Sequence, residues 1–527
     1  MPHTDVRADE RADVCLVLEG SYPYVKGGVS SWVHDLIQSL PDLRFALVHV
    51  GPEPGAYTRQ PYVLPPNVVR MMDLYCREPI ARGDRVAALD RTARAERMRH
   101  RRPSRPSWVL HGIRRLHVQE AADSFVLDDL AAGDLSVGAF LHGQASFDLT
   151  TELCERLAPD ASFLDFFWHF RSMHLPLVRL LAAEPPAAAM YHAVCTGYAG
   201  VLAAVWSHRT GRPLLLTEHG LYARERKLEL ERTNWFRGDR DGRRSDDIRG
   251  AVDSVTASTL RRIWTGFFSA LARCVYAQAS AVVSLCEASR EKQITDGAPP
   301  ERTVVVPNGI DLEGFLARVH RMPTRTGERR APRVGFVGRL APIKDIVTFI
   351  RACFLALHDE ELEVRIIGPT EEDPRYARRC RHLVARLGLE HRVHFERTLP
   401  IERVYPELDV VVLTSFSEGQ PLVILEAGAA GIPVVASDVG ACRELLEGRT
   451  DEDRALGPSG IVTRLAAPEE TAAAIARLVR DSDLRRRLGD AGRRRVAMSY
   501  RLSRTIDSYR TMYAGRLWPA SAGVSSA

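Results

Sequence analysis

Paired cysteines are missing from this chain. Its nine cysteines are scattered singly, and no C-x-x-C pair occurs among them. An odd number of unpaired cysteines is typical of reduced thiols in a cytoplasm and argues against a disulfide framework. Cys15 and Cys286 lie in apolar, strand-like runs, so we expect both to be small core residues.

Long apolar runs are also missing. The longest, such as VVVLTSF, have the length of a strand, whereas a membrane-spanning helix needs roughly 20 apolar residues. The N-terminal stretch MPHTDVRADERADVCLVLEG is charged where a signal peptide would be apolar. We therefore expect a cytoplasmic protein that is not exported.

An excess of either charge is missing as well. The chain has 72 basic and 67 acidic residues, a net charge of +5. This balance argues against a general nucleic-acid partner. With 527 residues, the chain exceeds the usual size of one hydrophobic core, so two domains are expected.

The first half has the order of a parallel α/β sheet. A buried-strand pattern at Val14–Gly20 is followed by a Gly-containing loop, a helical apolar pattern and a second strand at Arg44–Gly51. More strand-like runs occur near Met190 and at Pro213–Gly220, Ser280–Cys286 and Arg302–Ile310.

A second α/β series follows a polar, basic linker at 319–332. The predicted fold class is therefore α/β, with two Rossmann-like, doubly wound parallel-sheet domains facing a cleft. The predicted domains are 1–318, 319–498 and a C-terminal helix at 499–527 that crosses back to the first domain. Strands are predicted at Arg333–Leu340, Leu362–Pro369, Arg392–Glu396, Leu408–Ser415 and Ile432–Asp438.

Two insertions interrupt the first domain, at about 81–183 and 224–262. The first holds seven arginines between Arg91 and Arg105, typical either of a solvated surface or of a site that docks a partner or an anionic membrane. The second is densely charged and fits a lid over the cleft or an oligomer contact equally well.

Two cations follow the first strand of the second series. Gly338 ends that strand and allows a close backbone approach, and Arg339 and Lys344 come directly after it. A guanidinium that grips two oxygens and an ammonium that acts as a point charge suit a diphosphate, although such a pair is often only surface charge.

The stretch EGQPLVILE places two carboxylates around a predicted helix start. The helix is expected to begin near Gln420–Pro421, so that the N–H groups of Leu422 and Val423 form an anion site. Glu426, about one and a half turns into the helix, suits two ribose hydroxyls, and Glu418 suits sugar hydroxyls. Either acid alone could instead be a helix-dipole carboxylate.

The first domain offers two further candidates. Gly27 and Gly28 follow the first strand and allow a backbone to approach a phosphate, although a Gly-Gly pair is also a common turn. His219 stands just after a strand in TEHG, where a structural role is the alternative.

With these residues in place, the chain resembles the retaining, nucleotide-sugar-dependent glycosyltransferases of GT-B fold, family 4. The motifs VVPNGID, VGRL with a following lysine, and SEGQPLVILEA carry the resemblance in the second half. LEGSYPYVKGGVSSWVHDLI and TEHGLYARERKLEL resemble the PelF branch. Enzymes of that branch are cytoplasmic transferases that serve export of the Pel biofilm polysaccharide. The resemblance to them implies a UDP-sugar donor.

The resemblance also implies roles for the candidate residues. Arg339 and Lys344 would bind the donor diphosphate and stabilise the leaving UDP, Glu426 would hold the ribose, and Glu418 would contact the donor sugar. His219 would lie near the reaction centre, so the catalytic set is His219, Arg339, Lys344 and Glu418. The donor-binding set is Gly27, Gly28, Gly338, Arg339, Lys344, Glu418, Gly419, Pro421, Leu422, Val423 and Glu426.

The chain departs from the family pattern at one loop, and the resemblance does not identify a nucleophile. Many relatives have a Gly after the VHF strand, whereas Glu396, Arg397 and Thr398 follow here, so uracil is favoured by resemblance only. No protein nucleophile is named for the retaining reaction.

No metal or other cofactor is expected, because the two cations and the helix N-terminus neutralise the diphosphate and no D-x-D stands at a predicted strand end. The expected partners are the UDP-sugar, a growing glycan acceptor and an inner-membrane polysaccharide synthase or export complex.

Two other functions stay open. One is a sugar-nucleotide epimerase of the same fold, and the other is a non-catalytic nucleotide-sugar-binding subunit of a polysaccharide synthase. Glucose, N-acetylglucosamine and N-acetylgalactosamine all remain open as the donor sugar.

Overall fold

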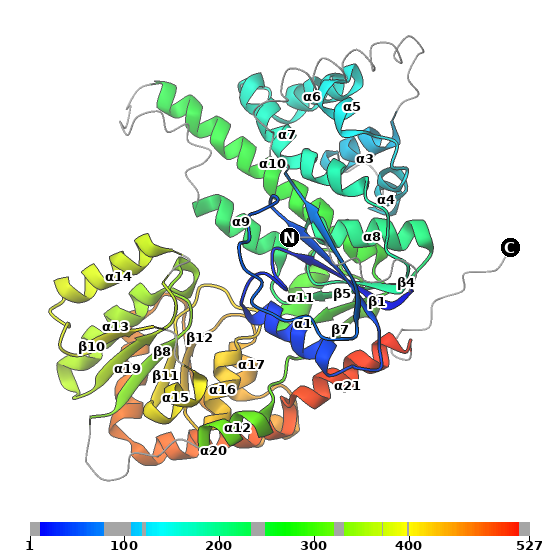
Figure 1. The fold of residues 1–527 in the computed structure, drawn as a ribbon. Coiled ribbons are helices and arrows are strands. Elements are labelled where there is room, and N and C mark those ends of the chain that lie inside the picture. Colours follow the sequence, from blue (N-terminus) through cyan, green and yellow to red (C-terminus); the bar gives the residue numbers. More distant parts are fainter. Residues whose placement is uncertain are drawn as a thin grey trace. The chain divides into compact units, whose positions relative to one another are not determined.

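A computed structural model describes residues 11–77, 107–118, 123–232, 248–320, 331–370, 373–397 and 400–515. The chain divides into two compact units. The first unit comprises Met1–Val283, Lys292–Val304 and Met512–Ala527. The second unit comprises Ser284–Glu291 and Val305–Thr511. Each has a parallel sheet of its own (Figure 1).

The sheet of the first unit has seven strands in the order β3-β2-β1-β4-β5-β6-β7. Its central strand β1 reads as a continuous apolar run because helices cover both faces of a parallel sheet. The helix after β4 is buried along most of its length, from Tyr198 to Ser207. The strands are β1 (Ala12–Glu19), β2 (Phe45–Gly51), β3 (Val68–Tyr75), β4 (Ala188–Ala193), β5 (Leu214–Glu218), β6 (Ala281–Ser284) and β7 (Thr303–Val305).

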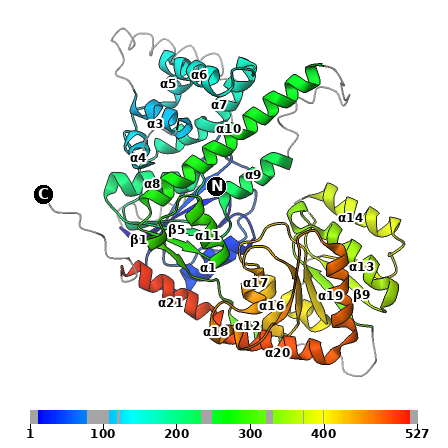
Figure 2. The same ribbon diagram turned by 180° about the vertical axis from the view of Figure 1, so that it is seen from behind.

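A group of helices lies between β3 and β4, where the sequence predicts an insertion at 81–183 (Figures 1 and 2). The Arg91–Arg105 segment of that insertion lies outside the described residues. The predicted insertion at 224–262 contributes most of α9 and the beginning of α10. The helices are α1 (Gly28–Gln38), α3 (Trp108–His117), α4 (Asp123–Ala131), α5 (Val137–His142), α6 (Gln144–Leu157), α7 (Phe163–Leu181), α8 (Tyr198–Thr210), α9 (Tyr222–Arg232) and α10 (Ile248–Gln278).

The sheet of the second unit has six strands in the order β10-β9-β8-β11-β12-β13. Successive residues of β11 face opposite sides, since Val410 and Val412 join one hydrophobic cluster while Val411 and Leu413 join another. Two layers of helices therefore sandwich this sheet. The strands are β8 (Arg333–Val337), β9 (Glu363–Ile367), β10 (Val393–Glu396), β11 (Val410–Leu413), β12 (Val434–Ser437) and β13 (Gly460–Thr463).

Helices α13 and α19 pack on one face of the second sheet, and α12, α16 and α17 pack on the other. The helices are α12 (Leu312–His320), α13 (Ile346–Asp359), α14 (Pro374–Arg386), α15 (Ile401–Val404), α16 (Leu422–Ala430), α17 (Cys442–Glu447), α18 (Asp451–Arg454), α19 (Pro468–Arg480) and α20 (Ser482–Ser499). Helix α11 (Glu287–Thr295) and helix α21 (Leu502–Tyr513) each contain a boundary between the units.

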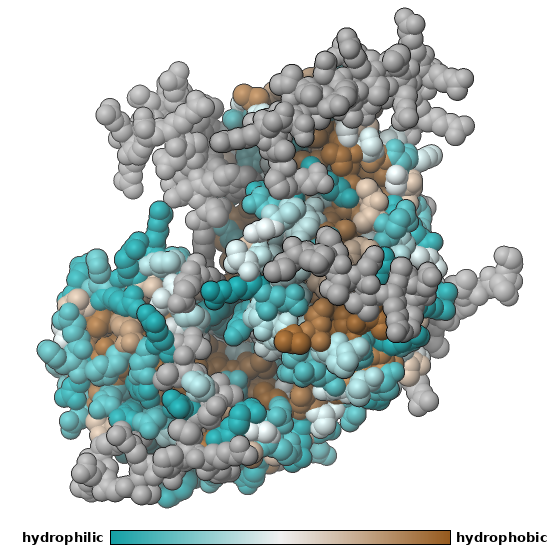
Figure 3. Space-filling view, viewed as in Figure 1, coloured by the Kyte–Doolittle hydropathy of each residue, from teal (hydrophilic) through white to brown (hydrophobic). Residues whose placement is uncertain are grey.

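The surface carries both polar and apolar side chains (Figure 3). Apolar side chains show in the upper part of the view in Figure 3. Among the exposed large apolar residues are Phe147 of α6 and Leu164 and Trp168 of α7. Within the described ranges, no helix combines the length and the apolar character that a membrane crossing requires.

Candidate functional site

The second unit brings Lys344 and Glu418 into direct contact. Lys344 lies in a 3₁₀ turn (Pro342–Lys344) after β8, and Glu418 lies in the loop after β11. The Lys344 Nζ donates to Glu418 Oε1 at 2.6 Å, and the buried Ser415 hydroxyl donates to the same oxygen at 2.6 Å. Only 18% of the Lys344 side chain and 11% of the Glu418 side chain are exposed, so solvent screens this ion pair little.

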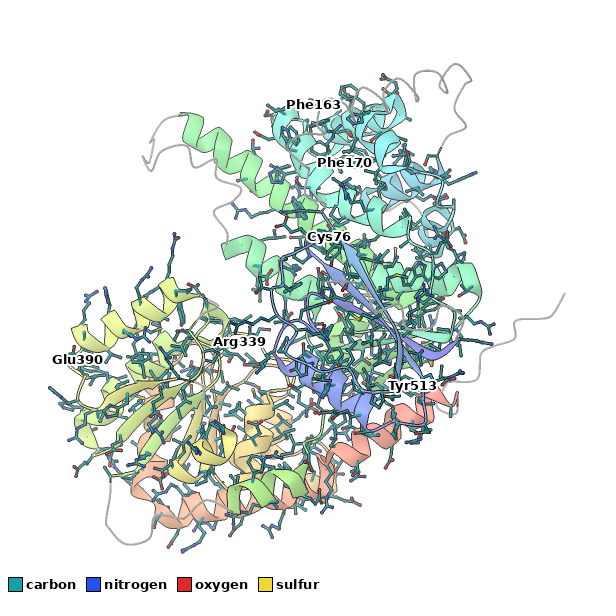
Figure 4. All side chains as sticks on the ribbon, viewed as in Figure 1. Cys76, Phe163, Phe170, Arg339, Glu390 and Tyr513 are labelled. Carbon is teal, nitrogen blue, oxygen red and sulfur yellow. The ribbon has the colours of Figure 1, made fainter. Side chains whose placement is uncertain are left out.

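Gly338 and Arg339 follow β8 at the carboxyl edge of the same sheet (Figure 4). Gly338 has a φ of +155°, a conformation that side-chain-bearing residues rarely adopt. Arg339 is exposed. The first strand of the second unit therefore presents both predicted cations at the sheet edge where ligands of doubly wound folds bind.

Helix α16 begins one residue later than predicted. Pro421 is its N-cap, and Leu422 and Val423 are its first two residues. No side chain caps this end. The first N–H groups of a helix have no partner within it, so this terminus suits an anion.

The loop before α16 is held by two contacts between segments that are distant in the sequence. The buried Gln420 side chain accepts from the Asn308 N–H at 2.6 Å and donates to the Asn308 carbonyl at 3.0 Å. Ala441 N donates to Gly419 O at 2.9 Å. Gly440, with φ +53°, leaves no room for a Cβ, which would lie 2.0 Å from Glu418 O. Glu418 is thus placed by backbone packing as well as by its ion pair.

Glu426 is the fifth residue of α16, and its carboxylate accepts a hydrogen bond from the Tyr405 hydroxyl. Tyr405 is fully buried. Glu426 keeps some exposed surface, yet protein atoms crowd its carboxyl group, and this burial raises its pKa. The Tyr405 hydrogen bond and the positive charge of Arg318 oppose the rise. The sequence pattern found Glu426 but not its partner, because Tyr405 belongs to another segment.

Glu396, one of the three residues that depart from the family pattern, lies in a two-point ion pair. Arg365 Nε donates to Glu396 Oε1 at 2.6 Å, and Arg365 Nη2 donates to Glu396 Oε2 at 2.5 Å. Thr398 lies outside the described residues. The carboxylate at the end of β10 therefore braces β9 against β10.

Gly27 and Gly28 belong to the first unit, where Gly27 is the N-cap of α1 and Gly28 is its first residue. Both are exposed, and a Cβ built on either would meet no atom within 4 Å. Packing within the described part of the chain therefore does not require glycine at either position.

His219 follows β5 and packs edge-on against Trp32 of α1, with 4.4 Å between the ring centroids. Burial lowers the pKa of His219 to about 3, so the ring is neutral near pH 7. Its Nε2 atom is buried and has no hydrogen-bond partner among the described residues.

His219 also lines a cavity of ≈ 760 Å³ that lies wholly within the first unit. The ends of four neighbouring strands supply its floor, through Glu19, Gly51, Cys76 and Cys195 (Cys76 is labelled in Figure 4). Helix α9 supplies a charged wall. The cavity thus opens at the carboxyl edge of the sheet, the usual place for a ligand in an α/β fold.

Residues 12–301 match the family described as "Domain of unknown function (DUF3492)". The chain belongs to this family. Residues 331–481 match the family described as "Glycosyl transferases group 1". The DUF3492 region contains Gly27, Gly28, His219 and the cavity, whereas the glycosyl transferase group 1 domain contains every candidate from Gly338 to Glu426.

Curated relatives match parts of the chain. A D-inositol 3-phosphate glycosyltransferase of Geodermatophilus obscurus is 33% identical over 244 residues, covering 43% of this chain and 50% of the relative. An MMP alpha-(1->4)-mannosyltransferase of Mycolicibacterium hassiacum is 29% identical over 301 residues, covering 55% of this chain and 62% of the relative. The chain thus spans half to three-fifths of the length of these relatives.

Solved structures match nearly the whole fold. Anabaena Alr3699/HepE, solved with UDP and glucose, has a TM-score of 0.56 and 16% identity, covering 96% of this chain and 100% of that one. The sucrose-phosphate synthase of Thermosynechococcus elongatus has a TM-score of 0.54 and 16% identity, covering 95% and 99%. The predicted GT-B class, with two Rossmann-like parallel-sheet domains, is confirmed.

Proposed function

We propose that this protein is a retaining glycosyltransferase of the PelF branch of family 4, which transfers a hexosyl or N-acetylhexosaminyl unit from a UDP-sugar to a growing glycan. The glycosyl transferase group 1 domain and the GT-B fold support the transferase class. The complexes of Anabaena Alr3699/HepE with UDP and with UDP-glucose support a UDP-sugar as the donor.

The contact between Lys344 and Glu418 carries the proposal. It places an ammonium and a carboxylate, 2.6 Å apart, in the loops that follow two adjacent strands, β8 and β11. The ammonium suits a phosphate oxygen, and the carboxylate suits the hydroxyls of the sugar attached to that phosphate. A nucleotide sugar offers both groups side by side.

The leaving diphosphate would be stabilised by Arg339, Lys344 and the N-terminus of α16, including the N–H groups of Leu422 and Val423. Gly338 and Gly419 allow the loops to approach the diphosphate, and Pro421 ends the loop at the helix. These charges favour catalysis without a metal, because the negative charge that develops on UDP is met by protein cations and dipoles.

The remaining residues would bind the sugar, the ribose and the phosphate of the donor. Glu426 would accept the ribose hydroxyls through its carboxylate, and Glu418 would hold the donor sugar. Gly27 and Gly28 would leave space for the phosphate, in keeping with the absence of any described atom within 4 Å of a Cβ built on either residue. His219, neutral near pH 7, would contact the donor sugar without adding charge to the oxocarbenium-like transition state.

The biological role proposed is synthesis of a Pel-type exopolysaccharide in a biofilm. It rests on the first-half motifs LEGSYPYVKGGVSSWVHDLI and TEHGLYARERKLEL. In that role the protein would act in the cytoplasm, next to an inner-membrane synthase or export complex.

The test is a thermal-shift screen of UDP-, ADP- and GDP-sugars, followed by transfer assays on the sugars that stabilise the protein. A bound donor raises the unfolding temperature according to its concentration relative to its Kd. We expect UDP-sugars to stabilise and a saccharide product to form. An epimerised UDP-sugar formed without an acceptor would identify an epimerase instead, and donor binding without any turnover would identify a binding subunit.

A further inference from the structure

We infer that the cavity of the first unit binds the end of a hydroxyl-rich saccharide that carries no negative charge, and thereby selects the acceptor. This inference rests on the proposed transferase function. It concerns a cavity in the DUF3492 region. No residue that lines this cavity belongs to the donor-binding set, and His219 is the member of the catalytic set among them.

Carboxylates outnumber guanidinium groups along the cavity. Glu19, Glu225 and Glu229 line it, against Arg77 and Arg226. Arg226 donates to Glu229 at 2.6 Å and lies over the Tyr222 ring, 5.0 Å from its centroid. An entering phosphate would have to compete with Glu229 for Arg226 and would meet two further carboxylates, so an anionic ligand is disfavoured.

Aromatic rings form the apolar part of the wall. Tyr222 and Trp264 both pack against Phe268, with ring centroids 5.8 Å apart in each pair. All three residues line the cavity, and so does Tyr198. Flat apolar rings beside carboxylate acceptors suit a sugar, which has an apolar C–H face and a rim of hydroxyl donors.

The wall is held rigidly where α9 begins. The Tyr222 hydroxyl donates to Glu19 Oε1 at 2.6 Å, and the Tyr222 N–H donates to the buried Glu218 at 3.4 Å. Glu218 also accepts from the Tyr276 hydroxyl at 2.5 Å and from Gln293 at 2.9 Å. Two carboxylates at the ends of β1 and β5 therefore fix the direction of the helix that carries Glu225 and Glu229.

Glycine at position 220 allows Glu225 to reach the cavity. A Cβ on Gly220 would lie 2.2 Å from Glu225 Oε1, so the carboxylate rests directly over the backbone of this residue. The motif TEHG is thus explained in part by packing. Its histidine lines the cavity, and its glycine makes room for one of the carboxylates.

Binding is measured by isothermal titration of the full chain with four probes. Three are tetrasaccharides, of glucose, of N-acetylglucosamine and of glucosamine, and the fourth is D-inositol 3-phosphate. We expect at least one tetrasaccharide to bind, and the double variant Glu225→Gln/Glu229→Gln to weaken that binding tenfold or more. The matched control is Glu231→Gln, which removes an exposed carboxylate of the same helix that does not line the cavity.

Tighter binding of inositol 3-phosphate than of any tetrasaccharide would overturn the inference. Equal affinities in the double variant and in Glu231→Gln would overturn it too, as would the absence of binding by all three tetrasaccharides. Titration of UDP on the same preparations tests the donor site by itself. Failure of UDP to bind would count against the proposed function, whereas failure of the saccharides alone would count against this inference.

Discussion

Lys344 and Glu418 are 74 positions apart in the chain, and their side chains meet at 2.6 Å. A buried serine hydroxyl donates to the same carboxylate oxygen. The pair joins the loops after β8 and β11, two strands that are neighbours in the sheet although β9 and β10 separate them in sequence. A single charge removed here would leave its partner poorly solvated.

The first prediction concerns the charge of Lys344. Lys344→Ala should lower kcat/KM for transfer from a UDP-sugar by about 100-fold or more, because the developing charge on UDP loses a preorganised cation. Arg339→Ala should act in the same direction, and steady-state kinetics with circular dichroism to verify folding measures both. Arg351→Ala, an exposed arginine on α13, is the control and should retain wild-type kinetics. Full turnover in both site variants would remove the leaving-group role.

The second prediction concerns Gly27 and Gly28. Because a Cβ at either position meets nothing within 4 Å, Gly27→Ala and Gly28→Ala should leave the unfolding temperature unchanged or raise it slightly. If the space holds the donor phosphate, kcat/KM should fall at least tenfold in the same variants. Thermal unfolding and kinetics on one preparation separate these effects. Unchanged kinetics in both variants would mean that the two glycines serve the turn alone.

Glu426 makes the third prediction, which concerns pH. Burial raises its pKa above the ordinary 4.5, so the folded protein holds this proton at a higher pH than the unfolded chain does. Its contribution to folding stability is therefore complete below pH 4.5 and is lost as pH rises through the folded pKa. Ribose hydroxyls need the ionised form, so UDP affinity should fall on acidification through that range. In Glu426→Gln the affinity should be lower and should vary less with pH, as titration calorimetry at several pH values can measure.

Tyr405→Phe provides a companion to that variant. The Tyr405 hydrogen bond opposes the rise in the Glu426 pKa, so its removal should move the acid limb of UDP binding to higher pH. An acid limb at the same pH in wild type and Tyr405→Phe would show that Glu426 does not control it.

Gln420 makes the fourth prediction. Gln420→Ala leaves the Asn308 N–H and carbonyl without their side-chain partner in a buried position, which should lower the free energy of unfolding by about 1–3 kcal/mol. Gln420→Glu should also destabilise, because a carboxylate oxygen would face the Asn308 carbonyl. Urea unfolding measures both variants. Wild-type stability in both would show that this bridge does not hold the loop.

The fifth prediction concerns four histidines with lowered pKa values. Burial lowers the pKa of His117 to about 4 and that of His192 and His219 to about 3, and it lowers the pKa of His174 well below its usual range. The unfolded chain binds these protons below pH 6.5 and the folded protein does not, so stability falls as pH drops through 6.5. The loss should approach roughly 1 kcal/mol per pH unit for each histidine.

Urea unfolding between pH 7.5 and pH 5 measures that slope, and His219→Gln should make it shallower by about one histidine's share. The comparison uses slopes rather than absolute stabilities, because the variant also loses the contact with Trp32. A slope that is the same in wild type and variant would contradict the prediction.

Sequence patterns located most of the fold. Most central strands are short apolar runs, because both faces of a parallel sheet are covered, and this pattern is visible without coordinates. The two strands that were missed, β3 and β13, lie at sheet edges. Strand β3 is half-buried along most of its length, and Ile461 and Val462 in the middle of β13 are also half-buried, so neither strand is a fully buried apolar run.

The sequence also indicates which side chains are donor-site candidates, because each candidate follows a predicted strand or lies near the start of a predicted helix. Lys344, Glu418 and Glu426 were recognised by type and position in the chain. The contacts that hold the site were not, since Tyr405, the partner of Glu426, and Asn308, the partner of Gln420, belong to segments that approach only after folding.

What the sequence determined by itself was the alternation of strands and helices and the kinds of side chain at the strand ends, since both depend on local periodicity. The tertiary structure alone decided which of these side chains meet. The cavity lined by Glu19, Glu225 and Glu229 combines residues of β1 and α9. These two elements are joined by the hydrogen bond from Tyr222 to Glu19, whose partners are 203 positions apart in the chain. Local propensity does not determine such a contact, because it forms only when the helices pack on the sheet.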